Sequence, residues 1–238
     1  MAAPDKGAAI FTSESFVVEA LERRTHLAAA PLSAYYPLVQ GSQWVYRIVD
    51  DGKRRTDTET ISSEMKRMHA QSVYQRVVDS SDGGHEVNYE NFSSSGQIQL
   101  HGIGDDSLSM VFSPPVAFPK LAKVGQRTVM DGKIDMVEDS VRIRGIYHSE
   151  IRVLANEKVQ VRAGTFNCVK VQFTIDLSLK FQKHAMHMID TQTDWMAKGV
   201  GSVKWTEKSH TETTDNGRHK VEESLSKSSL SSYSIGVL

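Results

Sequence analysis

The chain has 238 residues, and its 28 Lys and Arg nearly balance its 29 Asp and Glu. A formal net charge of -1 produces no overall field that would favour nucleic acid or an anionic membrane surface. The single cysteine, Cys168, excludes an intramolecular disulfide and a cysteine-based zinc cluster. No stretch approaches the roughly 18 consecutive apolar residues of a membrane-spanning helix, and no ordinary signal peptide is visible.

Residues 1–34 are predicted to form a lead-in and one helix. Ser13 or Ser15 is a suitable cap for a helix that runs from Phe16 to Leu27, and Pro31 would end it. This is the only helix that the sequence predicts with a clear pattern.

From Tyr35 onward the pattern is that of strands and turns. Trp44, Tyr46 and Ile48 alternate with their neighbours, and Asp51-Gly52 is typical of a hairpin tip. Residues 35–238 are therefore predicted to form a single antiparallel β-domain. Further strands are expected at 56–67, 70–79, 85–92, 96–103, 107–112, 127–137, 140–154, 158–163, 184–196, 200–212 and 218–228, with a last edge strand at 225–234.

Residues 113–119 hold three of the six prolines. Proline cannot donate a hydrogen bond to a β-ladder, so this segment is predicted to be an internal loop rather than part of a central strand.

The longest predicted strand covers residues 167–182, and an apolar side chain occupies every second position of it. Because successive strand side chains point to opposite faces, these residues line one face and must be covered. Such a strand indicates an all-β fold, in which one large curved antiparallel sheet forms a closed or half-open barrel. The apolar stripe is Val169, Val171, Phe173, Ile175, Leu177, Leu179 and Phe181.

The stripe is a candidate ligand-binding surface. Trp44, Tyr46 and Trp195 are further candidates, because their large rings could stack on a ligand or close a barrel mouth. The alternative for all three aromatic residues is packing in the core.

Two segments resemble known families. Val18–Ala30 is similar to the "L-E-x-R-x-L-L-A" segment of exported planctomycete proteins, which implies an address outside the cytoplasm. Tyr36–Tyr46, Val159–Val171 and Trp195–Lys204 resemble, in the same order, three blocks of the TapB-like family of bacterial envelope proteins. That resemblance implies an antiparallel β fold related to the half-barrels that carry lipoproteins, and it implies no catalytic residues.

Other chemistry has weaker support in the sequence. His184-Ala185-Met186-His187-Met188 offers imidazole and thioether ligands of the kind that copper prefers, but strand geometry places His187 opposite the other three. The adjacent acids Asp105-Asp106 and Glu138-Asp139 would suit a hydrolase only if they met in a cleft. No catalytic residue, metal ligand or cofactor is assigned.

The sequence thus predicts a non-enzymatic extracytoplasmic protein, in the periplasm or at the cell surface. It would bind a lipid, another apolar ligand or a segment of an envelope protein on the concave face of its sheet. Nucleic acid and a membrane span are not expected. The alternatives are an envelope hydrolase that uses carboxylates or a metal, and a purely structural surface-interaction module.

Overall fold

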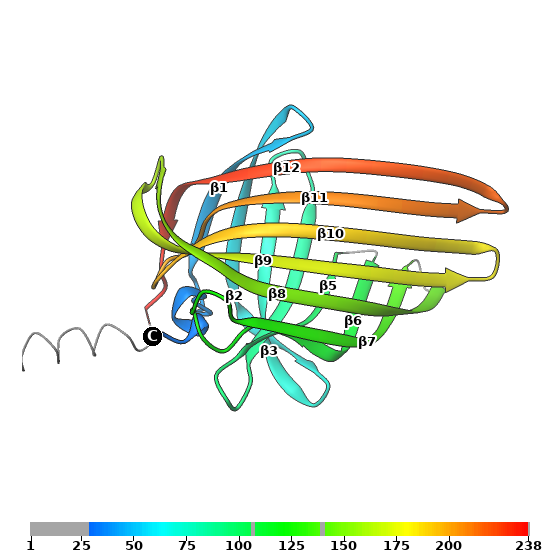
Figure 1. Cartoon of the computed structure of the whole chain (residues 1–238), viewed down its shortest axis with the longest axis horizontal. Helices are drawn as coiled ribbons and strands as arrows, with labels where there is room; N and C mark the ends of the chain where they lie inside the picture. Colours follow the sequence, from blue (N-terminus) through cyan, green and yellow to red (C-terminus); the bar gives the residue numbers. More distant parts are fainter. Residues whose placement is uncertain (1–28, 106–107, 139–140, 238) are drawn as a thin grey trace, which may run out of the picture. The chain divides into compact units, whose positions relative to one another are not determined.

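A computed structural model describes residues 29–105, 108–138 and 141–237. The chain divides into two compact units, Met1–Ala30 and Pro31–Leu238. The second unit is a closed antiparallel barrel (Figure 1). Within the described residues, no helix has the length and hydropathy that crossing a membrane would require.

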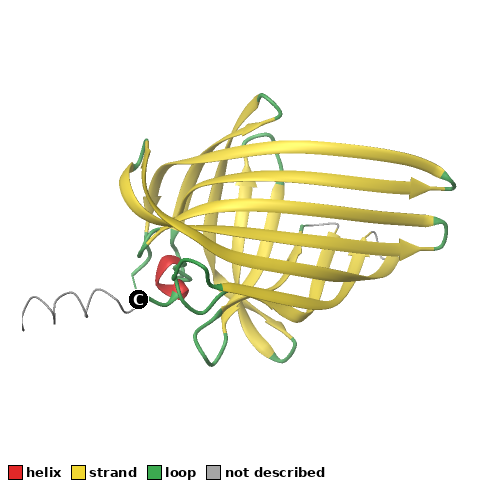
Figure 2. Cartoon of the chain, viewed as in Figure 1, coloured by secondary structure: helices red, strands yellow, loops and turns green. Residues whose placement is uncertain are grey.

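The barrel strands are hydrogen-bonded in chain order, and β1 closes the ring by pairing with both β2 and β12. Nearly all of the described chain is strand, as Figure 2 shows. The strands are β1 (Gln43–Asp50), β2 (Lys53–Met68), β3 (Gln71–Ser80), β4 (His85–Phe92), β5 (Ile98–Gly104), β6 (Leu108–Ala117), β7 (Arg127–Glu138), β8 (Val141–Val161), β9 (Gly164–Phe181), β10 (His184–Ala197), β11 (Gly201–Asp215) and β12 (Arg218–Ser234).

The predicted all-β barrel is confirmed, and so is the long strand, which is β9. The predicted helix from Phe16 to Leu27 lies outside the described residues. In the described part of the chain the helical structure is a four-residue 3-10 turn, η1 (Leu32–Tyr35).

Three details of the predicted strand pattern are wrong. The strands expected at 140–154 and 158–163 are one strand, β8, which continues through a register shift between Val153 and Ala155. A bulge of this kind lets a ladder continue past a local irregularity. The C-terminal strand is not an edge, because β12 pairs with β1 on one side and β11 on the other.

The third correction concerns the proline-rich segment, which begins inside β6 rather than in a loop. The pairing of β6 with β7 ends at Ser113. The register of β6 against β5 shifts between Val111, which pairs with Gly102, and Val116, which pairs with Leu100. Pro114 and Pro115 therefore occupy positions where the ladder with β7 has ended, and their missing N–H groups leave no gap in it.

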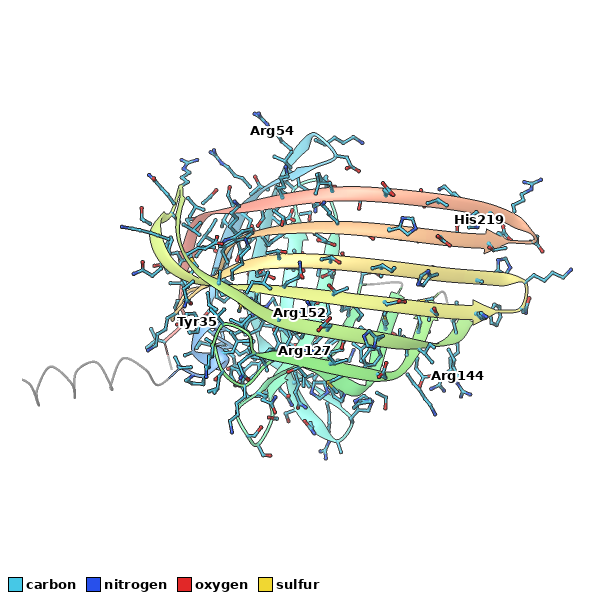
Figure 3. All side chains as sticks on the ribbon, viewed as in Figure 1. Tyr35, Arg54, Arg127, Arg144, Arg152 and His219 are labelled. Carbon is cyan, nitrogen blue, oxygen red and sulfur yellow. The ribbon has the colours of Figure 1, made fainter. Side chains whose placement is uncertain are left out.

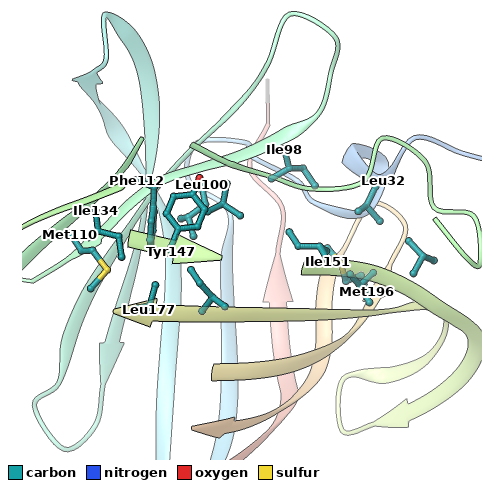
Figure 4. Packing of buried hydrophobic residues seen from close by; sticks show 14 of the residues in the cluster. Leu32, Ile98, Leu100, Met110, Phe112, Ile134, Tyr147, Ile151, Leu177 and Met196 are labelled. Atoms are coloured by element: carbon teal, nitrogen blue, oxygen red, sulfur yellow. The ribbon is translucent and has the colours of Figure 1, made fainter. Parts of the chain in front are cut away.

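The main core lies along the inside of the barrel wall. Figure 4 shows that its side chains come from the strands β5 through β10 and from the η1 turn. Tyr147 donates a hydrogen bond to the Pro114 carbonyl oxygen at 2.5 Å, and its ring meets that of Phe112 edge-on. The labelled members are Leu32, Ile98, Leu100, Met110, Phe112, Ile134, Tyr147, Ile151, Leu177 and Met196.

One end of the barrel is closed by the segment around η1. Leu32 N donates to Lys120 O at 3.0 Å, and Gly199 N donates to Ala34 O at 2.8 Å. Trp44, which is fully buried, donates from Nε1 to the Val200 carbonyl oxygen at 2.6 Å. The first two bonds hold the η1 segment across the barrel end, and the third joins β1 to the turn between β10 and β11.

The outer face carries paired charges. Arg127, Arg144 and Arg152 stand on the outside of β7 and β8 (Figure 3). Arg127 and Arg152 both reach Glu150, and Arg144 reaches Asp135. A polar outer face and an apolar inner face are what the alternation along these strands requires.

Candidate functional site

The apolar stripe of β9 faces the inside of the barrel. Val169, Val171, Ile175, Leu177 and Leu179 are buried, and Lys180 is exposed. A cavity of about 730 Å³ lies against this face. Its volume is within the range of about 300–1,000 Å³ that is usual for small-molecule sites. The exposed residues Asp82, Gly84 and Glu86 of the β3–β4 hairpin also line the cavity, so it reaches solvent there.

One side of the cavity is apolar. This apolar wall contains two phenylalanines, Phe118 and Phe173, whose rings stack with 6.2 Å between centroids. Both are only half-buried, so part of their apolar surface remains free to contact a ligand. The apolar wall consists of Leu100, Ile103, Met110, Phe112, Phe118, Val171, Phe173, Ile175, Leu177, Met188 and Met196.

The rest of the cavity lining is largely acidic. Among the described residues that line it are eight acidic side chains and two arginines. The arginines are Arg55 and Arg76, and the acids are Asp57, Glu59, Asp82, Glu86, Glu90, Asp190, Asp194 and Glu207.

Three of these acids lie on one face of the neighbouring strands β10 and β11 and are here called the acidic triplet: Asp190, Asp194 and Glu207. Glu207 on β11 pairs with Gln192 on β10, so that Asp190 and Asp194 lie diagonally on either side of it. Such diagonal neighbours on one face of a sheet are about 7–8 Å apart. Burial raises the pKa of Glu207 to about 7, and the charge of Asp190 adds to that increase. Burial also raises the pKa values of Asp190 and Asp194, each to about 6.

A second acidic group surrounds Arg76. Its Nη1 lies 3.2 Å from Glu59 Oε2, and its Nε lies 3.2 Å from Glu90 Oε2. Tyr36 donates a hydrogen bond to Glu90, and the guanidinium lies 4.6 Å from the centroid of the Tyr36 ring. Burial raises the pKa of Glu59 to about 7 despite the opposing effect of Arg76. One arginine thus serves two buried carboxylates.

Arg55 is also paired. Its Nη1 lies 2.7 Å from Asp50 Oδ2, and its Nε lies 3.0 Å from Asp57 Oδ1. Both arginines of the cavity are therefore neutralised by carboxylates of the protein itself.

The structure places the predicted ligand-binding residues in several different settings. Val171, Phe173, Ile175, Leu177 and Tyr46 line the cavity. Val169 and Leu179 are buried in the core, Phe181 is half-buried at the end of β9, and Trp44 packs at the closed end of the barrel.

Trp195 does not line the cavity. Its Nε1 donates to Glu157 Oε2 at 2.5 Å, and its ring lies 4.7 Å from Lys170 Nζ and 4.6 Å from Lys204 Nζ. Lys170 is its cross-strand partner on β9 and belongs to the face opposite the stripe. Trp195 therefore packs on the outer side of the wall.

The histidine and methionine cluster of β10 is split between the two faces. Met186 and Met188 pack against the inner core, and His187 Nε2 lies 2.9 Å from Asp176 Oδ1. His184 lies 3.1 Å from Asp215 at the strand end. Among the described residues, no group of three or more His, Cys, Asp or Glu side chains has an arrangement that could hold a metal ion. Asp106 and Asp139, from the adjacent acid pairs, lie outside the described residues.

A second hollow, of about 830 Å³, lies beside the β1–β2 hairpin. It is lined by both faces of β1, and Arg47, Val49, Arg54, Thr56 and Ser81 around it are exposed. It is a surface depression, and the interior cavity is the better candidate for a binding site.

The acidic triplet was not predicted from the sequence. The available signal is the period of two along β10, where Met186, Met188 and Met196 share a face with Asp190, Gln192 and Asp194. Three methionines on one face indicate an inward orientation, and the three polar residues between them must then point inward as well.

The chain is similar in fold to a solved candidate lipoprotein of Parabacteroides distasonis, with 15% sequence identity and a TM-score of 0.50 over 84% of this chain and 98% of that one. Two further structures match less well. A candidate exported protein of Bacteroides fragilis with a YmcC-like fold has 16% identity and a TM-score of 0.44 over 82% and 96% of the two chains. The hypothetical lipoprotein YmcC of Escherichia coli has 12% identity and a TM-score of 0.38 over 94% and 97%.

No curated protein matches the chain. The model of the DUF3108-like family matches residues 40–216, which is well over half of the sequence. The chain therefore belongs to the DUF3108-like family.

Proposed function

We propose that this protein holds an apolar or amphiphilic small molecule, such as a lipid, inside its barrel and performs no catalysis. The observation that carries the proposal is the cavity of about 730 Å³ along the β9 stripe. Burial of apolar ligand surface contributes roughly 25 cal/mol per Å², so a wall of this composition favours an aliphatic chain. A barrel with a filled interior would instead favour a purely structural role.

We further propose that the protein is located outside the cytoplasm. The resemblance of Val18–Ala30 to the exported planctomycete segment supports it, as does the resemblance of the three blocks from Tyr36 to Lys204 to TapB-like envelope proteins. The similar protein of Parabacteroides distasonis is described as a candidate lipoprotein, which agrees with this proposal.

Binding of N-phenyl-1-naphthylamine, a neutral apolar dye whose fluorescence increases in apolar surroundings, tests the proposed function. The full chain should increase the fluorescence with a saturable dependence on protein concentration. Phe173→Ser, which places a hydroxyl on the apolar wall, should weaken binding by about tenfold, or about 1.4 kcal/mol.

Thr174→Asp is the matched control, because Thr174 is the next residue on β9 and its hydroxyl meets Thr191 on the face opposite the stripe. Equal loss of binding in both variants, or no saturable binding by the parent chain, would contradict an interior site. Native mass spectrometry of protein purified gently from its own host should show the mass of a retained ligand.

A hydrolase is the second candidate function, because titratable groups from different strands meet in the cavity. Glu59 on β2 and Glu90 on β4 share Arg76, and the charge of Asp194 on β10 contributes to the raised pKa of Glu59. Carboxyl groups with a pKa near the working pH are suited to general acid–base catalysis. Turnover of glycoside or ester substrates that is lost in Glu59→Gln would support this function over simple binding.

A further inference from the structure

The acidic side of the cavity limits the chemical class of the ligand. Resting on the proposed function, we propose that the ligand is a cationic amphiphile, an aliphatic chain that ends in a protonated amine. Its chain lies along the apolar wall, and its ammonium group lies at the acidic triplet.

Strand pairing places the two halves of such a ligand site side by side. On the inner face, Asp190 pairs with Ile175, Gln192 pairs with Phe173, and Asp194 pairs with Val171. The polar row of β10 therefore runs directly beside the apolar row of β9, and Glu207 on β11 widens the acidic side. A molecule that spans this boundary must be apolar along one part and cationic at another.

No ion pair neutralises the triplet, and Arg76, whose charge lowers the pKa of Asp194, is itself held by Glu59 and Glu90. Within the described residues, no Lys, Arg or His side chain forms an ion pair with Asp190, Asp194 or Glu207. Asp194 accepts hydrogen bonds from Ser202 and Gln192, which are neutral. The Asp190 Oδ1 atom is buried and lacks a hydrogen-bond partner among the described residues. A buried carboxylate oxygen without a partner costs free energy, and a bound ammonium N–H would remove that cost.

An anionic head group does not fit the same cavity. Arg76 is held by Glu59 and Glu90, and Arg55 is held by Asp50 and Asp57. A fatty-acid carboxylate would therefore meet carboxylates of the protein and no unpaired guanidinium. Carboxylates of the ligand and of the protein repel each other, so the cavity should reject such a ligand.

Three ligands with the same twelve-carbon chain test the inference: dodecylamine, dodecanol and dodecanoate, each below its aggregation concentration. Displacement of N-phenyl-1-naphthylamine from the full chain is measured at about pH 8, where an alkylamine is protonated and carboxyls with pKa values of about 6 to 7 are ionised. Dodecylamine should bind at least about tenfold more tightly than dodecanol, and dodecanoate should bind most weakly.

The triple variant Asp190→Asn, Asp194→Asn, Glu207→Gln should lose the preference for dodecylamine and keep its affinity for dodecanol. Asp176→Asn with Glu212→Gln is the matched control, because these acids pair with His187 and His210 away from the cavity. The control should keep the preference. Asp194→Asn alone, which retains the other two acids, should reduce the preference partly and remains informative if the triple variant does not fold.

The outcomes separate the two proposals. Equal displacement by dodecylamine and dodecanol would overturn the cationic ligand and leave the proposed function intact. Displacement by none of the three, with no saturable dye binding, would overturn the proposed function itself.

Discussion

Ile175 and Asp190 are cross-strand partners on the inner wall of the barrel, one in the apolar stripe and the other in the acidic triplet. Partners of this kind have Cβ atoms about 4.5–5.5 Å apart. The boundary between the two sides of the cavity is therefore one strand spacing wide. A ligand needs to extend only across β9 and β10 to contact both.

Shortening the stripe should destabilise the barrel. Leu177 is buried and lines the cavity, so Leu177→Ala should lower the free energy of unfolding by about 2–3 kcal/mol. Ser178→Ala, at the next and outward-facing position, should change it by less than about 0.5 kcal/mol. Urea unfolding followed by tryptophan fluorescence measures both, and equal effects would contradict the assigned orientation of β9.

Removing the shared arginine should leave two buried carboxylates without a cation. Arg76→Met should destabilise the protein by about 3 kcal/mol at neutral pH, because breaking a buried ion pair leaves uncompensated charge. Adding Glu59→Gln and Glu90→Gln should recover most of the loss. Thermal unfolding of the single and triple variants tests this, and a triple variant as unstable as the single one would argue against the charge explanation.

Stability should fall as the pH rises from about 4.5 to about 7. The folded-state pKa of Glu207 is raised to about 7, chiefly by burial, so the folded protein keeps a proton that the unfolded chain has released. The unfolded state then binds fewer protons, and the free energy of unfolding decreases with pH. Glu207→Gln should therefore stabilise the protein by about 1–2 kcal/mol at pH 7.5, with allowance for partial exposure, and by little at pH 4.5. Melting curves at both pH values measure the difference, which a pH-independent effect would contradict.

Trp195 should contribute to stability and not to binding. Trp195→Phe removes the hydrogen bond to Glu157 and weakens the contacts with Lys170 and Lys204, which should cost about 1–2 kcal/mol. The affinity for N-phenyl-1-naphthylamine should be unchanged, because the ring is outside the cavity. A loss of dye binding in a folded Trp195→Phe protein would show that the ring does reach the ligand.

Gly132 should tolerate no larger residue. A Cβ atom there would lie 2.7 Å from Tyr147 Cζ and 2.8 Å from the Ser113 carbonyl oxygen. Gly132→Ala should therefore destabilise the barrel by about 2 kcal/mol or more. Gly84→Ala is the control, because its nearest neighbours would be 3.4 Å away, at ordinary contact distance. Similar melting temperatures for the two variants would contradict the close packing of Tyr147 and Ser113 around Gly132.

Much of the wall could be predicted from alternation alone. The stripe of β9 has seven apolar residues in phase, so its existence and inward face follow from the period of two. The break expected within β8 has a clear cause, since Ala155-Asn156-Glu157-Lys158 is typical of a turn in isolation. Pairing with β9 along the whole segment overrides that local preference.

The polar side of the cavity was harder to predict. Aspartate and glutamate usually face solvent, so a strand with Asp190, Gln192 and Asp194 gives no direct sign that these side chains point inward. Glu59, Arg76 and Glu90 come from the three neighbouring strands β2, β3 and β4, and the pairing of these strands brings them together. The alternation of apolar and polar residues along one strand does not show which side chains of other strands will contact it.

The pairing of Gln43 with Ser234 joins the first and last strands of the barrel. Contacts between residues so distant in sequence form slowly, because the long intervening loop must close before they gain any stability. During synthesis, β1 must therefore wait with one hydrogen-bonding edge exposed until β12 has left the ribosome. Loss of β12 would leave open edges on β1 and β11, so truncated chains should aggregate rather than retain a partial binding site.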